Sequence, residues 1–131
     1  MPSVRLATYP DVLTIVDYVE QLREAVRGPV PVDRSWTAST VARLIASPDA
    51  VVFISDGGFL AGLLQPTVIN PQPVAMEVGW YASDRSGLAL LRAFEGWAAE
   101  RGAMLVQLST GAEGLDLSRL GYRKTEIAWV K

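Results

Sequence analysis

The stretch that decides the fold is Glu77–Leu91, EVGWYASDRSGLALL, within which the spacing of the apolar residues changes. Before Ser83 the side chains alternate, with Glu77, Gly79 and Tyr81 on one face, as is typical of a β-strand. After it, apolar residues recur every three or four positions, as on one face of an α-helix. The stretch therefore predicts a strand, residues 74–83, followed almost at once by a helix, residues 86–101.

The upstream residues predict five further strands and helices before this unit. A Thr8–Asp11 capping box, with Pro10 in the first turn, predicts the start of a helix, and Asp56-Gly57 is a strong hairpin signal. The expected elements are a first strand at Val4–Leu6, a helix ended by Gly28-Pro29, a shorter helix ended by Ser47-Pro48, and hairpin strands at Ala50–Ser55 and Phe59–Ile69.

Three shorter elements are expected after the 86–101 helix. They are a buried strand at Met104–Leu108, a brief helix within Gly111–Arg119 and a last strand at Tyr122–Val130, where side chains alternate again. The order β-α-α-β-β-β-α-β-α-β, with no linker or repeat, predicts one α+β domain over residues 1–131, in which helices flank a mixed sheet.

The composition excludes several kinds of chemistry. Half of the 131 residues are apolar, the formal net charge is −2, and there is no cysteine and no histidine. Thiolate nucleophiles, Ser-His-Asp triads, imidazole bases and Cys/His metal sites are therefore excluded, so no metal site is expected. No basic cluster is long enough for a nucleic acid, and no apolar run is long enough for a bilayer. We expect a cytoplasmic protein that binds neither.

The element order, the segment Glu77–Leu91 and the later Leu120-Gly121-Tyr122 together resemble the GNAT (Gcn5-related) N-acetyltransferases. The resemblance covers nearly the whole chain. The helix sequence Leu90–Ala103 looks closest to the small single-domain members that phages encode. The resemblance implies a mostly antiparallel mixed sheet, acetyl-CoA as cofactor, and an amine-bearing small molecule or protein as acceptor; a homodimer is also plausible.

The resemblance also implies which residues hold acetyl-CoA. Tyr81, Ala82 and Ser83 would hold the pantetheine arm, and a loop of Arg85, Ser86, Gly87, Leu88 and Ala89 would bind the pyrophosphate through backbone amides. This loop is about three residues shorter than the family pattern, and Asp84 would lie beside the anion. The alternative is structural: Ser83 or Asp84 caps the helix, Arg85 is solvated and Gly87 relieves packing.

Two residues are candidates for catalysis. Glu77 stands where many GNAT enzymes place their general base, and burial would raise its pKa toward neutrality; otherwise it is a surface carboxylate. Tyr122 is a candidate proton donor, or else a core residue, because the family's usual tyrosine position is occupied by Leu117. Trp36 either lines an acceptor pocket or anchors its loop.

Two functions remain open from the sequence. The first is an acetyl-CoA-dependent N-acetyltransferase that moves acetyl to a primary amine by direct attack. The second is a catalytically degenerate GNAT-fold protein that acts by binding another protein. The shortened loop and Leu117 favour the second, whereas Glu77, Gly87 and Ala89 favour the first.

Overall fold

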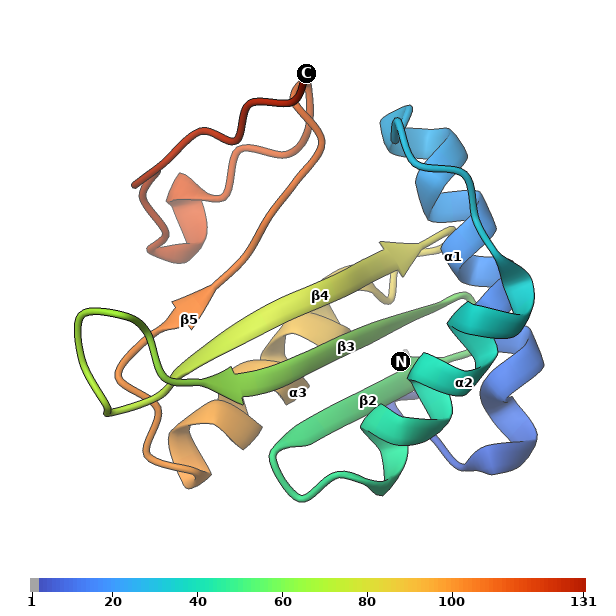
Figure 1. Ribbon diagram of the computed structural model, residues 1–131, viewed down its shortest axis with the longest axis horizontal. Helices are drawn as coiled ribbons and strands as arrows, with labels where there is room; N and C mark the ends of the chain where they lie inside the picture. The colour runs from blue at the N-terminus through green and yellow to red at the C-terminus, as the bar shows by residue number, and fades with distance from the viewer. Residues whose placement is uncertain (1–2) are drawn as a thin grey trace.

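The computed structural model describes residues 3–131, which form a five-stranded sheet with helices on both faces (Figure 1). The strands follow the chain in the order β1-β2-β3-β4-β5; all neighbours are antiparallel except β4 and β5. The strands are β1 (Arg5–Leu6), β2 (Ala50–Ser55), β3 (Gly58–Gln65), β4 (Val74–Ala82) and β5 (Val106–Gln107). The predicted α+β class is confirmed.

Three α-helices and two 3-10 turns complete the fold. The α-helices are α1 (Val12–Val26), α2 (Arg34–Ala46) and α3 (Gly87–Glu100), and the 3-10 turns are η1 (Tyr9–Asp11) and η2 (Ser118–Leu120). At the start of η1 the Asp11 carboxylate accepts hydrogen bonds from the Thr8 N–H and hydroxyl, at 2.8 and 3.2 Å. This confirms the expected capping pair.

The sheet separates two cores. On one face α3 buries Leu90, Leu91 and Phe94 completely against Leu60 and neighbouring strand residues. On the other face α1 and α2 bury Ile15 and Val41 against Val52, Ile54 and Phe59. Apolar burial on both faces holds the central strands, so β4 is a rigid base for anything that binds along it.

A β-bulge interrupts β4 at Val78. Gly62 of β3 pairs with Glu77, whereas its neighbour Ala61 pairs with Gly79, so Val78 is the extra residue. Strict alternation therefore runs from Tyr81 to Gly79 but does not continue to Glu77. The expectation that all three side chains share one face of the strand is wrong for this reason.

The last predicted strand, at residues 122–130, does not form. Residues 122–130 are irregular, and the Ile127 and Trp129 side chains are 73 and 89 % exposed. A strand needs a partner for its backbone groups. The neighbouring β5 offers only two paired residues, where five were expected. The brief helix predicted before it is the single turn η2, and the predicted 59–69 strand ends at Gln65, before Pro66, which has no N–H to donate.

Helix α1 ends on a strained residue. The left-handed position after Val26 is occupied by Arg27 (φ 53°, ψ 45°), not by Gly28. Replacing Arg27 by glycine removes a Cβ that is unfavourable in this conformation, so we expect the free energy of unfolding to rise by about 1 kcal/mol. Urea denaturation of the variant and wild type measures the difference; unchanged or lower stability would contradict the expectation.

Candidate active site

Strands β4 and β5 pair only at one end and then separate. Their register pairs are Ala75 with Val106 and Met76 with Gln107, and no strand pairs with that edge of β4 from Glu77 onward within residues 3–131. Figure 1 shows the chain after β5 turning away from β4. We call the unpaired edge of β4, residues 77–82, the open edge. Its backbone N–H and C=O groups are available to an extended ligand that carries amides of its own.

Glu77 lies where the two strands begin to separate. Its Oε1 accepts a hydrogen bond from the N–H of Ser109, at 2.9 Å, which links β4 to the chain after β5. The side chain is half-buried, and burial raises the pKa of Glu77 to about 7, against a smaller lowering by the Ser109 N–H. A carboxylate with this pKa can both accept and release a proton near neutral pH.

The raised pKa makes stability depend on pH. Between the unfolded pKa of 4.5 and about 7, folded Glu77 holds a proton that the unfolded chain releases, so the free energy of unfolding falls as pH rises through this window. Glutamine carries no proton that can be lost, so the free energy of unfolding of Glu77→Gln should not fall in this way. We expect the difference in this free energy between Glu77→Gln and wild type to be about 1–2 kcal/mol larger at pH 8 than at pH 5.5, after allowance for partial exposure. Urea titrations at both pH values measure it; an equal difference between the variants at both would contradict it.

The turn between β4 and α3 is held by its own hydrogen bonds. Asp84 Oδ1 accepts from the Ser86 N–H at 2.9 Å and from the Ser86 hydroxyl at 2.5 Å. The Ser86 hydroxyl also lies 2.7 Å from that of Ser55, and Ser86 is 1 % exposed. Ser86 is therefore a buried link between the hairpin and α3. Ser86 is also the N-cap residue, and no side chain among residues 3–131 caps α3, so the expectation that Ser83 or Asp84 caps the helix is wrong: Asp84 holds the turn that precedes it.

The hydrogen-bond donors of Ser83 are also used within the protein. Its N–H and hydroxyl both donate to the carbonyl of Gly57, at 2.8 and 3.0 Å. The Asp84 carboxyl group lies directly over Gly57, whose Cβ, were there one, would fall 2.4 Å from the Asp84 Cγ. Of the three residues expected to hold pantetheine, Ser83 thus has no free donor, whereas Tyr81 and Ala82 belong to the open edge.

The side chains of Tyr81 and Ala82 point away from each other. The Tyr81 ring packs beside Tyr18 of α1, with ring centroids 6.1 Å apart, and the Ala82 methyl packs on the α3 side of the sheet. Both side chains are used for packing, so only the backbone of these residues can contact a ligand along the open edge.

The first turn of α3 presents free backbone amides. The N–H groups of Gly87, Leu88 and Ala89 have no backbone acceptor within the described part of the chain, whereas that of Leu90 donates to Ser86. A Cβ at Gly87 would meet its nearest neighbour at 3.6 Å, so packing does not require glycine there. The Gly87 carbonyl accepts from Trp80 Nε1 at 3.2 Å, which ties the helix to β4. The Arg85 side chain is exposed.

Tyr122 lies against α3. Its hydroxyl donates to Glu95 Oε2 at 2.7 Å, and Glu95 is held in turn by Arg92 at 2.8 Å. Burial and the Glu95 carboxylate raise the pKa of Tyr122 well above its usual value. The residue anchors the C-terminal segment to α3, and no hydrogen bond joins it to Glu77 among residues 3–131.

Comparison with solved structures identifies the architecture. The chain superposes over its whole length on a GCN5-related N-acetyltransferase from Ralstonia eutropha JMP134, with a TM-score of 0.76, 15 % identity and 99 % of that chain covered. The chain has the GNAT acetyltransferase fold. No protein-family model matches the sequence. A search of curated proteins finds no match either.

Two other structures with this GNAT fold bear on the site. A predicted acetyltransferase of Clostridium acetobutylicum, solved with acetyl-CoA, matches with a TM-score of 0.80 and 18 % identity over 100 % of this chain and 95 % of that one. A protein of Arthrobacter sp. FB24 assigned as an acetyltransferase matches with a TM-score of 0.74 and 27 % identity over 100 and 90 %. These three neighbours are described as acetyltransferases, whereas a further structure with the same fold, from Bacillus halodurans C-125, is described as a transcriptional regulator.

A groove of about 480 Å³ runs between α1 and the segment that leads into α2. It is lined mainly by apolar side chains, among them Val26 and Trp36, and Trp36 is 66 % exposed with Arg43 stacked over its ring. Trp36 therefore lines a pocket. A Cβ at Gly111, two residues after Ser109, would fall 3.2 Å from Val26, so the chain that follows β5 packs against a residue that lines the groove.

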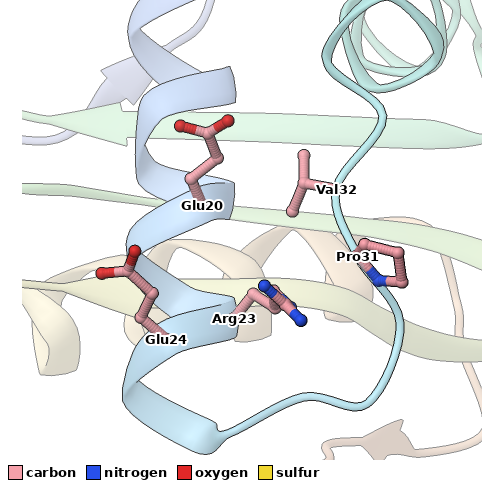
Figure 2. Close-up of a pocket in the computed structure, with 5 residues that line it drawn as sticks. All are labelled: Glu20, Arg23, Glu24, Pro31 and Val32. Carbon is pink, nitrogen blue, oxygen red and sulfur yellow. The ribbon is translucent and has the colours of Figure 1, made fainter.

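A smaller hollow of about 170 Å³ adjoins this groove on the same helix. Figure 2 shows Glu20, Arg23 and Glu24 projecting from α1, with Pro31 and Val32 on the facing segment. Arg23 Nε donates to the carbonyl of Gly28 at 3.2 Å, and Glu20 pairs with Arg34 at 2.8 Å. These charges are used in holding the segment to α1.

Within residues 3–131 the structure brings Glu77, Tyr81 and Ala82 together along the open edge, and Gly87, Leu88 and Ala89 at the start of α3. It sets Tyr122 apart on Glu95. Sequence reasoning missed Ser109, because its contribution is a backbone N–H that any residue would supply. It also missed Ser55, a serine inside a buried strand, which is a polar residue where an apolar one is expected.

Proposed function

We propose that this protein is an acetyl-CoA-dependent N-acetyltransferase that moves the acetyl group to a primary amine by direct attack. The observation that carries the proposal is the position of Glu77, a carboxylate with a pKa of about 7, at the end of the open edge where β4 and β5 begin to separate. The alternative, a degenerate protein that only binds partners, has no use for a carboxylate tuned to neutral pH in this place.

The residues present fit a pantetheine thioester. The open edge offers backbone donors and acceptors to an arm that contains two amides, and the first turn of α3 offers three amides and the positive end of the helix dipole. Tyr81 and Ala82 would hold the arm, and Gly87, Leu88 and Ala89 would lie nearest to the phosphates. Acetyl-CoA, when bound, supplies the acetyl group as a thioester.

The chain's own groups then have distinct roles. Glu77 accepts a proton from the ammonium form of the acceptor, directly or through a water, and so provides the neutral amine that attacks. A backbone N–H of the open edge near Tyr81 stabilises the negative charge that develops on the carbonyl oxygen. Tyr122 is the candidate that would protonate the leaving thiolate, but its hydroxyl donates to Glu95 and its raised pKa makes it a weak acid there, so it takes this role only when that hydrogen bond breaks.

The test is an assay for free thiol. Wild-type protein is incubated with acetyl-CoA and a panel of primary amines that includes small aliphatic, aromatic and peptide amines, and thiol release is followed with a chromogenic disulfide. The proposal expects release that depends on both protein and amine. The degenerate alternative predicts the opposite, namely no release with any amine and no stabilisation by acetyl-CoA.

For the acceptor, the groove that Trp36 lines is the candidate site, because its lining residue Val26 packs against Gly111, two residues after Ser109. The apolar lining suits an amine with an apolar or aromatic body. Likeness to phage-encoded members, a homodimer and a cytoplasmic location stay predictions from the sequence. Among residues 3–131, no helix combines the length and hydropathy needed to cross a bilayer.

A further inference from the structure

The turn between β4 and α3, residues 83–86, has already used most of the groups that would bind a diphosphate. The Ser83 N–H and hydroxyl donate to Gly57, and the Ser86 N–H and hydroxyl donate to Asp84. The Ser86 hydroxyl is also buried against Ser55. Among residues 3–131, the N–H groups of Gly87, Leu88 and Ala89 have no backbone acceptor, and the exposed Arg85 side chain is a further donor available to an anion.

Two carboxylates lie close to this end of α3. The Asp84 carboxylate is ionised at neutral pH, because the hydroxyl and N–H of Ser86 hold the pKa of Asp84 below its usual value. Asp56 lies in the adjoining hairpin turn; after burial, the charges of Asp84 and Asp56 raise the pKa of Tyr18, so both carboxylates lie near the Tyr18 hydroxyl. Arg85 is exposed in the same turn, and Arg5 lies near Asp56, because the Asp56 charge raises the pKa of Arg5. Asp84 is therefore the carboxylate that opposes a diphosphate placed here.

The open edge of β4 differs from this turn both in its free hydrogen-bonding groups and in its charge. The backbone groups of β4 that face away from β3 have no strand partner beyond Met76 in the described residues, and the side chains of Tyr81 and Ala82 are uncharged. A neutral chain with amides gains hydrogen bonds along this edge, whereas a nucleotide end gains little at the start of α3. The two halves of a CoA thioester therefore meet very different surfaces.

We infer that the donor site recognises the pantetheine arm and makes little use of the nucleotide end, so that its substrate class is acyl-pantetheine thioesters in general. The inference rests on the proposed function and narrows it. The short turn between β4 and α3, in which Asp84 binds the Ser86 N–H and hydroxyl, then sets the specificity for the acyl donor.

Titration calorimetry with three probes tests the inference: acetyl-CoA, S-acetylpantetheine and adenosine 3′,5′-bisphosphate. We expect the Kd of S-acetylpantetheine to lie within about 10-fold of that of acetyl-CoA, and the bisphosphate to give no heat at 1 mM, roughly a thousand times weaker than a micromolar ligand. A preference for acetyl-CoA of more than about 100-fold would overturn the inference alone. Binding of neither thioester would overturn the proposed function as well.

Asp84→Asn provides the second arm. An asparagine Oδ1 still accepts from Ser86, so the turn keeps its hydrogen bond and loses only its charge. We expect acetyl-CoA to bind about 3- to 10-fold more tightly, less so at high salt, and S-acetylpantetheine to bind as before. Asp49→Asn is the matched control, because it removes an exposed carboxylate at the opposite end of α3. The neighbouring Pro48 carbonyl accepts a hydrogen bond from Arg101, which follows the C-terminal end of that helix. Equal acetyl-CoA affinity in both variants would contradict the inference.

Discussion

Replacing Glu77 by glutamine lowers kcat by about 10²- to 10⁴-fold and leaves the Kd of acetyl-CoA within about 2-fold, because glutamine keeps the shape and the Ser109 hydrogen bond but cannot accept a proton. Steady-state thiol release measures kcat, and calorimetry measures the Kd. The acceptor found in the amine panel serves for both proteins.

The pH profile identifies the group. Because burial raises the pKa of Glu77 to about 7, kcat/KM of wild type rises with pH up to about 7 and then levels off. The residual activity of Glu77→Gln lacks this limb. Glu100→Gln, an exposed carboxylate at the end of α3, is the matched control and keeps wild-type rates. If Glu77→Gln keeps wild-type turnover with the same limb, the base is another group.

Replacing Gly58 by alanine lowers the free energy of unfolding by about 2–3 kcal/mol. Gly58 pairs with Ala82, and a Cβ there would fall 2.1 Å from the Tyr81 carbonyl oxygen and 2.7 Å from the Ala82 Cα. Both are backbone atoms of β4 that face β3, and they cannot turn aside as a side chain can. The end of β4 must shift, so acetyl-CoA affinity falls as well.

Gly96→Ala is the matched control for this substitution. Gly96 is an exposed position inside α3, and a Cβ there would meet nothing within 4 Å. Alanine is the better helix former, so stability rises by about 1 kcal/mol. Urea denaturation of both variants measures the contrast; equal stabilities would show that the hairpin accommodates a side chain at Gly58.

Local signals were sufficient for much of the fold. The Asp56-Gly57 pair predicted the hairpin, which the structure confirms with Ser55 opposite Gly58. Neither Asp56 nor Gly57 has a φ in the left-handed region, however, and glycine at 57 instead leaves room for the Asp84 carboxyl group. The change of period at Ser83 likewise predicted α3 to within a residue at each end.

Features that depend on distant partners could not be predicted. Residues 122–130 alternate like a strand, but alternation says nothing about whether an edge is available for pairing. The bulge at Val78 depends on register with β3, which the sequence of β4 does not encode. The position of Glu77 was predictable by resemblance, whereas its pKa depends on burial beside the chain that carries Ser109.

The central claim is that the open edge of β4 binds a pantetheine thioester beside Glu77. Thermal unfolding of wild-type protein with increasing acetyl-CoA tests it most directly. The account predicts a Tm that keeps rising with the logarithm of the acetyl-CoA concentration, with about 2.7 kcal/mol of added stability at a hundred times the Kd. A Tm that does not change at millimolar acetyl-CoA would contradict it.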